Sequence, residues 1–274
     1  MCLNRVMTSI KVSYSRVEFH AEATTLAAKL GIDVVMLDSV KPDTVIHSDY
    51  HLHIGPEGLS LLPVPRSIHG PIMCQFDGGA NSHRRKYGGG NGQAIAKAVG
   101  LSGKFSPNVL DLTAGLGSDG FVLAGLGCRV KLLERNAVIF SLLHDGLARA
   151  QRAALDGSDL SDVISRMTLI EGDAQDFLTG LAADDVEDVI YLDPMFPERR
   201  KRAKVKKEMQ AFQHIVGADQ DAAKLLPLAL ERARYRVVVK RSASADFLAG
   251  RQPSYSLEGK STRFDIFALR KLPS

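Results

Sequence analysis

Residues 191–197, YLDPMFP, combine an acid, a proline and an aromatic ring in a pattern that suits the positioning of a planar amine. The Asp193 carboxylate can accept hydrogen bonds from amine hydrogens, and Pro194 fixes its own φ so that a backbone carbonyl is aimed. The Phe196 ring can stack on a flat base, while Met195 contributes mainly its backbone. We therefore expect Asp193, Pro194 and Phe196 to be catalytic, by turning an amine nitrogen toward a methyl donor. The alternative is an ordinary strand end, with the proline starting a helix and the phenylalanine in the core.

A second group of residues forms a glycine-rich turn of the kind that approaches nucleotides. Gly115, Gly117 and Gly120 follow the pattern G-x-G-x-x-G between a predicted strand and a predicted helix. Glycine at these positions lets the backbone come close to a ligand. Glu134 follows Gly115 by 19 residues and can accept hydrogen bonds from both hydroxyls of a ribose. These features suit a nicotinamide dinucleotide and S-adenosylmethionine equally well.

Two carboxylates favour S-adenosylmethionine over the dinucleotide. Asp111 directly precedes the glycine turn, where its negative charge would attract a cationic amino-acid group and repel a pyrophosphate. Asp193 follows another predicted strand, and ligands of open α/β sheets gather at the carboxyl ends of the strands. The pattern therefore predicts a methyltransferase that acts on an amine. An NAD-dependent dehydrogenase with the same glycine loop is the alternative, and a catalytically silent RNA-binding protein is another.

A dense basic run follows directly after residues 193–196, which we name the catalytic turn. Seven basic residues lie within nine positions: Arg199, Arg200, Lys201, Arg202, Lys204, Lys206 and Lys207. The net charge of the whole chain is only +4, so the run exceeds it and the remainder is slightly negative. Such clustering indicates a polyanionic partner, and we expect these residues to bind RNA phosphates without choosing sequence. A solvated helix face is the alternative.

A smaller basic cluster lies between glycine-rich stretches in SHRRKYGGG. It consists of Arg84, Arg85 and Lys86. We expect these three residues to contact RNA as well, and a flexible solvated loop is the alternative.

From about residue 107 onward, predicted strands and helices alternate. We predict strands at 108–112, 129–134, 167–171, 188–193 and 235–240, and helices near 118–126, 136–153, 174–182 and 219–233. Two further strands, 253–258 and 262–269, flank Gly259 and indicate an antiparallel edge. The pattern is typical of an α/β fold of the Rossmann-like class I methyltransferase type, with a mostly parallel sheet and an antiparallel edge hairpin.

Composition divides the chain into three parts. Residues 1–75 contain short β-like runs, VVML (34–37), TVIH (44–47), HLHI (51–54) and LSLL (59–62), separated by Asp, Pro and Gly. They predict a small N-terminal α/β or β-rich domain. Residues 76–106 form a glycine-rich connecting segment with a helix from about Gln93 to Val99. Residues 107–274 form the predicted S-adenosylmethionine-dependent methyltransferase domain.

The composition excludes membrane-spanning and secreted classes of protein. The chain has 274 residues, of which 45% are hydrophobic and 24% are charged, as in ordinary globular proteins. No apolar run approaches the roughly 20 residues of a membrane span, and the first residues lack the features of a secretory signal. We therefore expect a cytoplasmic protein with no membrane partner.

No metal is expected either. The three cysteines are far apart, which suggests neither a disulfide framework nor a thiolate zinc site. His47, His51 and His53 lie in IHSDYHLHI, but no additional ligand type or spacing supports coordination.

Several stretches of the chain resemble the bacterial small-subunit ribosomal RNA guanine-N2 methyltransferase J family, whose members are S-adenosylmethionine-dependent enzymes with a Rossmann-like fold. They are SHRRKYGGGNGQAIAKAVG (82–100), DLTAGLGSDGFVLAGLGCRVKLLERN (111–136), YLDPMFP (191–197), VKKEMQAFQ (205–213), RVVVKR (236–241) and RFDIF (263–267). Together they extend over most of residues 76–270.

This resemblance implies a cofactor site, a product and a partner. By position, the family's cofactor contacts fall on Ser118 and Asp119, Glu134 and Arg135, Asp173 and Ala174, and Asp193. The implied product is a methylated N2 amine on one guanosine of the small-subunit (16S) ribosomal RNA. The implied partner is that RNA or the small ribosomal subunit particle. Methyltransferases of other planar amines, in DNA adenine or protein glutamine, are the nearest alternatives.

Overall fold

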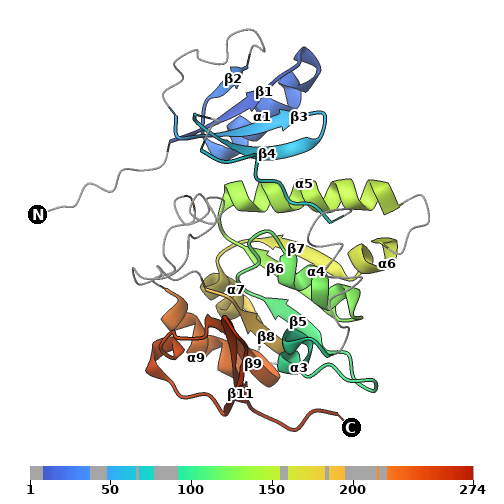
Figure 1. The fold of residues 1–274 in the computed structure, drawn as a ribbon, viewed down its shortest axis with the longest axis vertical. Coiled ribbons are helices and arrows are strands. Elements are labelled where there is room, and N and C mark those ends of the chain that lie inside the picture. The colour runs from blue at the N-terminus through green and yellow to red at the C-terminus, as the bar shows by residue number, and fades with distance from the viewer. Residues whose placement is uncertain are drawn as a thin grey trace, which may run out of the picture. The chain divides into compact units, whose positions relative to one another are not determined.

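A computed structural model describes residues 9–37, 48–65, 68–76, 92–154, 160–182, 185–194, 215 and 221–273. The chain forms two compact units, which are drawn in Figure 1. The described residues of the first unit lie mainly within 9–74, and those of the second lie within 75–194 and 221–273. Within these described ranges, no helix is both long and apolar enough to cross a membrane.

The first unit is a small α/β structure built on a four-stranded sheet. In the order β2-β1-β3-β4, its strands are β2 (Val34–Met36), β1 (Ile10–Tyr14), β3 (Tyr50–Gly55) and β4 (Gly58–Pro63). Strand β1 is parallel to β2 and β3, and β4 is antiparallel to β3. A 3-10 turn (Val17–Phe19) and helix α1 (His20–Leu30) connect β1 to β2. The α/β alternative for the N-terminal domain is therefore confirmed.

Strand β1 and helix α1 are not predicted by the sequence patterns. Helix α1 buries only Ala23 and Ala27, so it lacks the broad apolar stripe by which an amphipathic helix is recognised. The β-like runs expected near residues 34–37, 51–54 and 59–62 correspond to β2, β3 and β4. The run at 44–47 lies outside the described residues.

The second unit is built on a seven-stranded sheet (Figure 1). In the order β10-β11-β9-β8-β5-β6-β7, its strands are β10 (Tyr255–Glu258), β11 (Thr262–Ala268), β9 (Ala233–Ser242), β8 (Glu187–Leu192), β5 (Asn108–Asp111), β6 (Arg129–Glu134) and β7 (Met167–Glu171). Strands β5 to β9 are parallel, whereas β11 is antiparallel to β9 and β10 to β11. The predicted mostly parallel sheet with an antiparallel edge hairpin is confirmed.

Helix α3 (Ala94–Val99) precedes the first parallel strand, β5. The helices that connect the parallel strands are α4 (Ser118–Gly125), α5 (Ala137–Ala154), α6 (Leu160–Ser165), α7 (Ala174–Gly180) and α9 (Ala222–Arg232), and a 3-10 turn (Leu248–Gly250) follows β9. All predicted helices are present, with ends that differ by a few residues, and the short α6 is additional. The strand predicted at 188–193 ends at Leu192, where the next N–H, that of Asp193, donates to Thr113 Oγ1.

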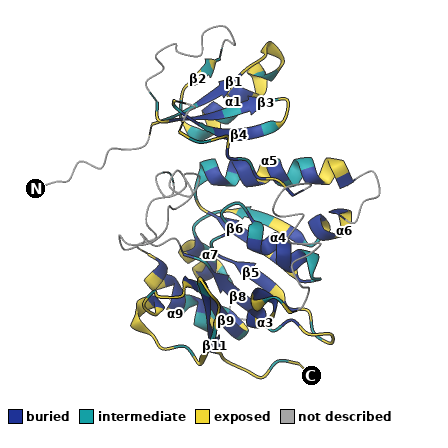
Figure 2. Cartoon of the chain, in the orientation of Figure 1, coloured by how far each residue is buried: buried dark blue, intermediate teal, exposed yellow. Residues whose placement is uncertain are grey.

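The centre of this sheet is buried on both faces, as the dark strands of Figure 2 show. Every residue of β8 is buried. On one face, Leu110 and Ile190 of the sheet share a core cluster with Leu178 of α7 and Leu226 of α9. Because close packing holds these strands in place, the residues at their carboxyl ends keep a defined geometry.

Candidate active site

Four acidic residues lie at the carboxyl ends of the parallel strands. Asp111 and Glu134 are the last residues of β5 and β6, Asp173 comes shortly after β7, and Asp193 directly follows β8. The strand order reverses at β5, which lies between β6 and β8. Ligands of open α/β sheets bind outside the carboxyl ends of strands at such a reversal. The structure therefore brings these four predicted residues to one edge of the sheet, which we name the carboxyl edge.

The glycine turn between β5 and α4 depends on left-handed backbone. The φ angles of Gly115 and Gly117 are 55° and 72°, values that glycine adopts without the steric cost of a side chain. A Cβ atom on Gly117 would also lie 2.8 Å from Cδ1 of Leu143. The turn is therefore tight, and it leads directly into α4, whose first residue is Ser118.

The Glu134 carboxylate is oriented by the backbone around it. Its Oε2 accepts a hydrogen bond from the Gly115 N–H at 2.9 Å, and its Oε1 accepts one from the Asn136 N–H at 2.8 Å. The residue is only 7% exposed. Each carboxylate oxygen can accept more than one hydrogen bond. Glu134 can therefore receive ribose hydroxyls while the backbone holds it still.

Asp111 is a buried carboxylate near two other acidic side chains, so a positive charge beside it would stabilise its ionised form. Burial raises its pKa to about 7, and the charges of Asp119 and Asp193 add to this, whereas hydrogen bonds from Thr113 oppose it. Its Oδ1 accepts from the Thr113 N–H at 3.0 Å and from the Thr113 hydroxyl at 3.3 Å. No lysine or arginine in the described ranges forms an ion pair with Asp111. A bound ammonium group would supply that charge, so the site fits the cationic amino-acid group expected there.

Lys240 of β9 connects two of the acidic side chains. Its Nζ lies 2.7 Å from Asp119 Oδ2 and 2.7 Å from Asp193 Oδ2. The Tyr191 hydroxyl donates to the same Asp119 oxygen at 2.8 Å. Burial lowers the pKa of Lys240, but the two carboxylates outweigh burial and raise it. Lys240 therefore stays protonated, and its positive charge lies between the carboxylates of Asp119 and Asp193.

Lys240 was not identified from the sequence. It is 121 residues from Asp119 and 47 residues from Asp193, so no local spacing connects the three. The available signal is its place directly after three valines, near the end of a strand whose neighbour, β8, leads into the predicted catalytic turn.

Asp193 is held through both its backbone and its side chain. Its N–H donates to Thr113 Oγ1 at 2.6 Å, while its carboxylate pairs with Lys240. Partial burial raises the pKa of Asp193, and the positive charge of Lys240 opposes that rise. The side chain is 40% exposed, so a substrate can reach it. The adjacent Pro194 is buried.

The predicted cofactor residues after β6 and β7 also lie together. Arg135 Nη1 is 3.5 Å from Asp173 Oδ2 and 3.6 Å from Asp221 Oδ2. Asp173 caps the start of α7, and the buried Ala174 is the first residue of that helix. Arg135 and Asp173 are therefore in position to act on the same part of a ligand.

Several predicted residues lie outside the part of the chain that the structure describes. They are Phe196 of the catalytic turn, the cluster Arg84, Arg85 and Lys86, and the basic run Arg199, Arg200, Lys201, Arg202, Lys204, Lys206 and Lys207. Their roles stay predictions.

The histidines considered as metal ligands have other contacts. His51 Nε2 lies 2.9 Å from Ser48 Oγ, and His53 Nδ1 lies 3.0 Å from Ser13 Oγ. His47 lies outside the described residues. Over the residues that are described, no group of three potential metal ligands is found.

Comparison with known proteins gives concordant matches to methyltransferases. A family model for SAM-dependent methyltransferases matches residues 39–269. Curated relatives named "Ribosomal RNA small subunit methyltransferase J" include one from Cellvibrio japonicus, 54% identical over 85% of this chain and 88% of its own. Another, from Hahella chejuensis, is 46% identical over 96% of each chain.

A solved structure is similar to nearly the whole chain. It is a SAM-dependent methyltransferase from Neisseria gonorrhoeae, with 31% sequence identity and a TM-score of 0.70. The match covers 94% of this chain and 95% of that one. The similarity therefore includes the fold and is not limited to the glycine turn.

Proposed function

Since the chain belongs to the ribosomal RNA small subunit methyltransferase J family, we propose that it methylates the N2 amine of one guanosine in small-subunit ribosomal RNA. It is an S-adenosylmethionine-dependent methyltransferase. The observation that carries the choice of an amine is the Asp193 carboxylate, which Lys240 holds at the carboxyl edge that also contains Glu134. The family match removes the dehydrogenase alternative.

The residues at the carboxyl edge fit S-adenosylmethionine. Glu134 offers oriented oxygens to the ribose, and Asp111 offers a buried negative charge to the ammonium group. The glycine turn leaves room for backbone contact, and Ser118, Asp119, Arg135, Asp173 and Ala174 surround the same edge. When bound, S-adenosylmethionine supplies an electrophilic methyl group on a positively charged sulfur.

Asp193 is proposed to orient the amine and to take its proton. The carboxylate accepts a hydrogen bond from one amine hydrogen, and the backbone carbonyl of Pro194 accepts the other. As the amine nitrogen bonds to the methyl carbon, the bond from that carbon to sulfur would break, and its electron pair would stay on sulfur as a neutral thioether. The methylated amine then loses one proton, which Asp193 accepts and passes to water. Burial raises the pKa of Asp193, and the positive charge of Lys240 opposes this and favours the ionised carboxylate. The predicted Phe196 ring would hold the base flat against this group.

The substrate is proposed to be ribosomal RNA in the cytoplasm, either as RNA or within the small ribosomal subunit particle. The family match supports the RNA, and the predicted basic run Arg199–Lys207 would bind its phosphates. We infer the location from the substrate.

The test is transfer of labelled methyl from S-adenosylmethionine to small-subunit ribosomal RNA that lacks the modification, followed by nucleoside analysis. The expected product is N2-methylguanosine at one site. Methyl incorporation elsewhere, or only into DNA or protein, would refute the proposed substrate.

The first mutational prediction concerns Asp193. Asp193→Ala should lower the single-turnover rate of methyl transfer by about a hundredfold or more, the usual loss when one positioned transition-state group is removed. Saturating S-adenosylmethionine keeps any loss of cofactor affinity out of the rate. RNA affinity and melting temperature serve as controls and should stay near those of the wild type. A variant that methylates within about threefold of the wild type would exclude this carboxylate from the mechanism.

A further inference from the structure

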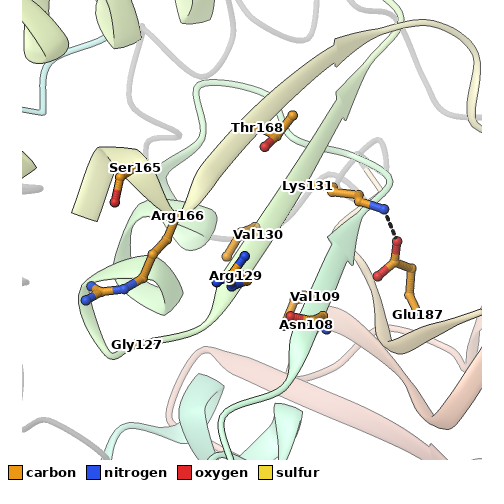
Figure 3. Close-up of a pocket in the computed structure, with 10 residues that line it drawn as sticks. All are labelled: Asn108, Val109, Gly127, Arg129, Val130, Lys131, Ser165, Arg166, Thr168 and Glu187. Atoms are coloured by element: carbon orange, nitrogen blue, oxygen red, sulfur yellow. Dashed lines mark hydrogen bonds and ion pairs between the residues drawn. The ribbon is translucent and has the colours of Figure 1, made fainter. Parts of the chain in front are cut away.

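An open polar groove lies at the amino ends of β5, β6 and β7, away from the carboxyl edge (Figure 3). Its volume is about 480 Å³. Among the described residues, the polar side chains that line it are Arg129, Lys131, Arg166, Ser165, Thr168 and Asn108, and the one carboxylate is Glu187. We name this feature the amino-edge groove. It has no part in the mechanism above.

The amino-edge groove lies where the residues on one face of β6 become exposed. Alternate residues of a strand share a face, so Arg129, Lys131 and Leu133 of β6 point the same way. Leu133 is buried in the core cluster that contains Leu178 of α7. Arg129 is exposed, and the Lys131 side chain is 46% exposed. One face of β6 therefore changes from apolar and covered to basic and open within five residues.

Two of the three cations are already held in place. Lys131 Nζ pairs with Glu187, as Figure 3 shows, and Arg166 Nη1 donates to the backbone carbonyl of Ala124 at 3.2 Å. The Arg129 side chain has no ion pair or hydrogen bond with any residue of the described ranges. The described lining therefore has three cations and one carboxylate and is positively charged, and the Arg129 guanidinium is available to bind an anion.

The chemistry of this lining matches a phosphate backbone. Arginine, lysine, serine, threonine and asparagine side chains are the usual contacts to phosphate and sugar oxygens. None of the described residues that line the groove is aromatic, so they offer a base no ring on which to stack. The contact would therefore add affinity without reading sequence.

We propose that the amino-edge groove binds the sugar–phosphate backbone of the ribosomal RNA substrate at a distance from the catalytic turn. Arg129 and Glu134 are five residues apart on one strand, which places the groove about 17 Å from the cofactor contacts. A folded RNA can bridge that span while its target guanosine lies at the carboxyl edge. The inference rests on the proposed function, because it takes the substrate from there.

The test variant is Arg129→Gln in the full chain. Binding of unmodified small-subunit ribosomal RNA is measured over a series of salt concentrations. We expect the dissociation constant to rise about threefold to tenfold, and the slope of log affinity against log salt to become shallower by about one, as for one lost phosphate contact. S-adenosylmethionine affinity and the methyl-transfer rate at saturating RNA should not change. Arg129→Lys, which keeps the charge, should bind nearly as well as the wild type.

The matched control is Arg152→Gln, the same change at an exposed arginine of α5. It should leave the affinity and the salt slope unaltered. If Arg129→Gln binds RNA like the wild type while the wild type methylates that RNA, the groove proposal fails and the proposed function stands. If the wild type binds the RNA but does not methylate it, the proposed function fails instead. Binding of inorganic phosphate is measured for both proteins as well. If Arg129→Gln binds phosphate more weakly than the wild type but binds RNA equally well, the groove is a small-anion site and the proposal is overturned.

Discussion

At the scale of single residues, three carboxylates and one lysine share a small volume at the carboxyl edge. Asp119 and Asp193 both contact Lys240, and the negative charges of these two acids raise the pKa of Asp111. Acidic groups this close raise one another's pKa, whereas the positive charge of Lys240 lowers the pKa of Asp193. The chemistry proposed for Asp193 requires its carboxylate form, which makes Lys240 a positioning residue for the reaction.

Replacing Lys240 should change the pH profile of methyl transfer. Lys240→Met removes the charge that opposes the burial-driven rise in the pKa of Asp193, so that pKa should rise further. Activity that needs the carboxylate is present above this pKa and is lost as the pH falls through it. The acid limb of the single-turnover profile should therefore move to higher pH, and the rate at pH 7 should fall about tenfold or more.

Lys240→Arg is the control, because it keeps the charge and should keep the acid limb near its wild-type position. Melting temperatures show whether each variant is folded. A Lys240→Met profile that is only scaled down, with no movement along the pH axis, would contradict the role given to Lys240.

Asp111 should make cofactor binding depend on pH. Its pKa is raised to about 7 by burial, so a bound ammonium group would lower that pKa and release a proton. Affinity for S-adenosylmethionine should increase as the pH rises toward 8. Without the cofactor, Asp111 should have the opposite effect on folding. The free energy of unfolding should decrease as the pH rises from 3.8, the ordinary pKa of this group, through about 7, because the folded protein then buries a charged carboxylate.

Titration calorimetry at pH 6, 7 and 8 measures the binding effect. Asp111→Asn should weaken S-adenosylmethionine binding by about 1–3 kcal/mol at pH 8, as expected for a lost charged hydrogen bond. It should also flatten the pH dependence. A variant that keeps the wild-type dependence would mean that another group titrates on binding.

At the scale of elements, the sequence is most informative where periodicity is strong. The apolar run of β8 is buried on both faces, and β6 is buried from Leu132 to Glu134 although its Arg129 and Lys131 are exposed. These apolar runs predict a parallel sheet whose strand ends carry Glu134 and Asp193. Helix α1 buries only two alanines, and short α6 leaves little pattern to detect. The contact of Lys240 with Asp119 joins β9 to α4 across 121 residues, and it follows from packing rather than from local spacing.

The glycine turn offers a test of an element as a whole. Gly117→Ala places a side chain at a φ of 72° and a Cβ atom 2.8 Å from the buried Leu143. We expect a loss of about 1–3 kcal/mol in the free energy of unfolding, from left-handed strain and overpacking together. Affinity for S-adenosylmethionine should also fall, because the turn starts α4 at the cofactor edge.

Gly103→Ala is a matched control for this change. Gly103 has no atom within 4 Å of an added Cβ and lies in an exposed loop. Gly103→Ala should leave the free energy of unfolding and the affinity for S-adenosylmethionine nearly unchanged. Equal unfolding midpoints in urea for the two variants would refute the requirement for glycine in the turn.

At the scale of the whole molecule, positive charge is concentrated where RNA contact is proposed. The net charge is only +4, yet the run Arg199–Lys207 alone carries seven basic residues. A chain organised in this way gains affinity for a polyanion without a high overall charge. Cofactor binding depends on separate side chains at the carboxyl edge, so the two kinds of binding should be separable by mutation.

The last prediction uses this separation. Changing Arg199, Arg200, Lys201 and Arg202 together to Gln should weaken binding of small-subunit ribosomal RNA. The slope of log affinity against log salt should become shallower by about three to four, since each lost phosphate contact removes close to one released counterion. S-adenosylmethionine affinity should survive. The control neutralises four exposed basic residues elsewhere, Arg152, Lys224, Arg251 and Arg270, with the same change in net charge. If the two quadruple variants lose equal affinity, the effect is one of net charge, and the run Arg199–Lys207 is a solvated surface and not an RNA contact.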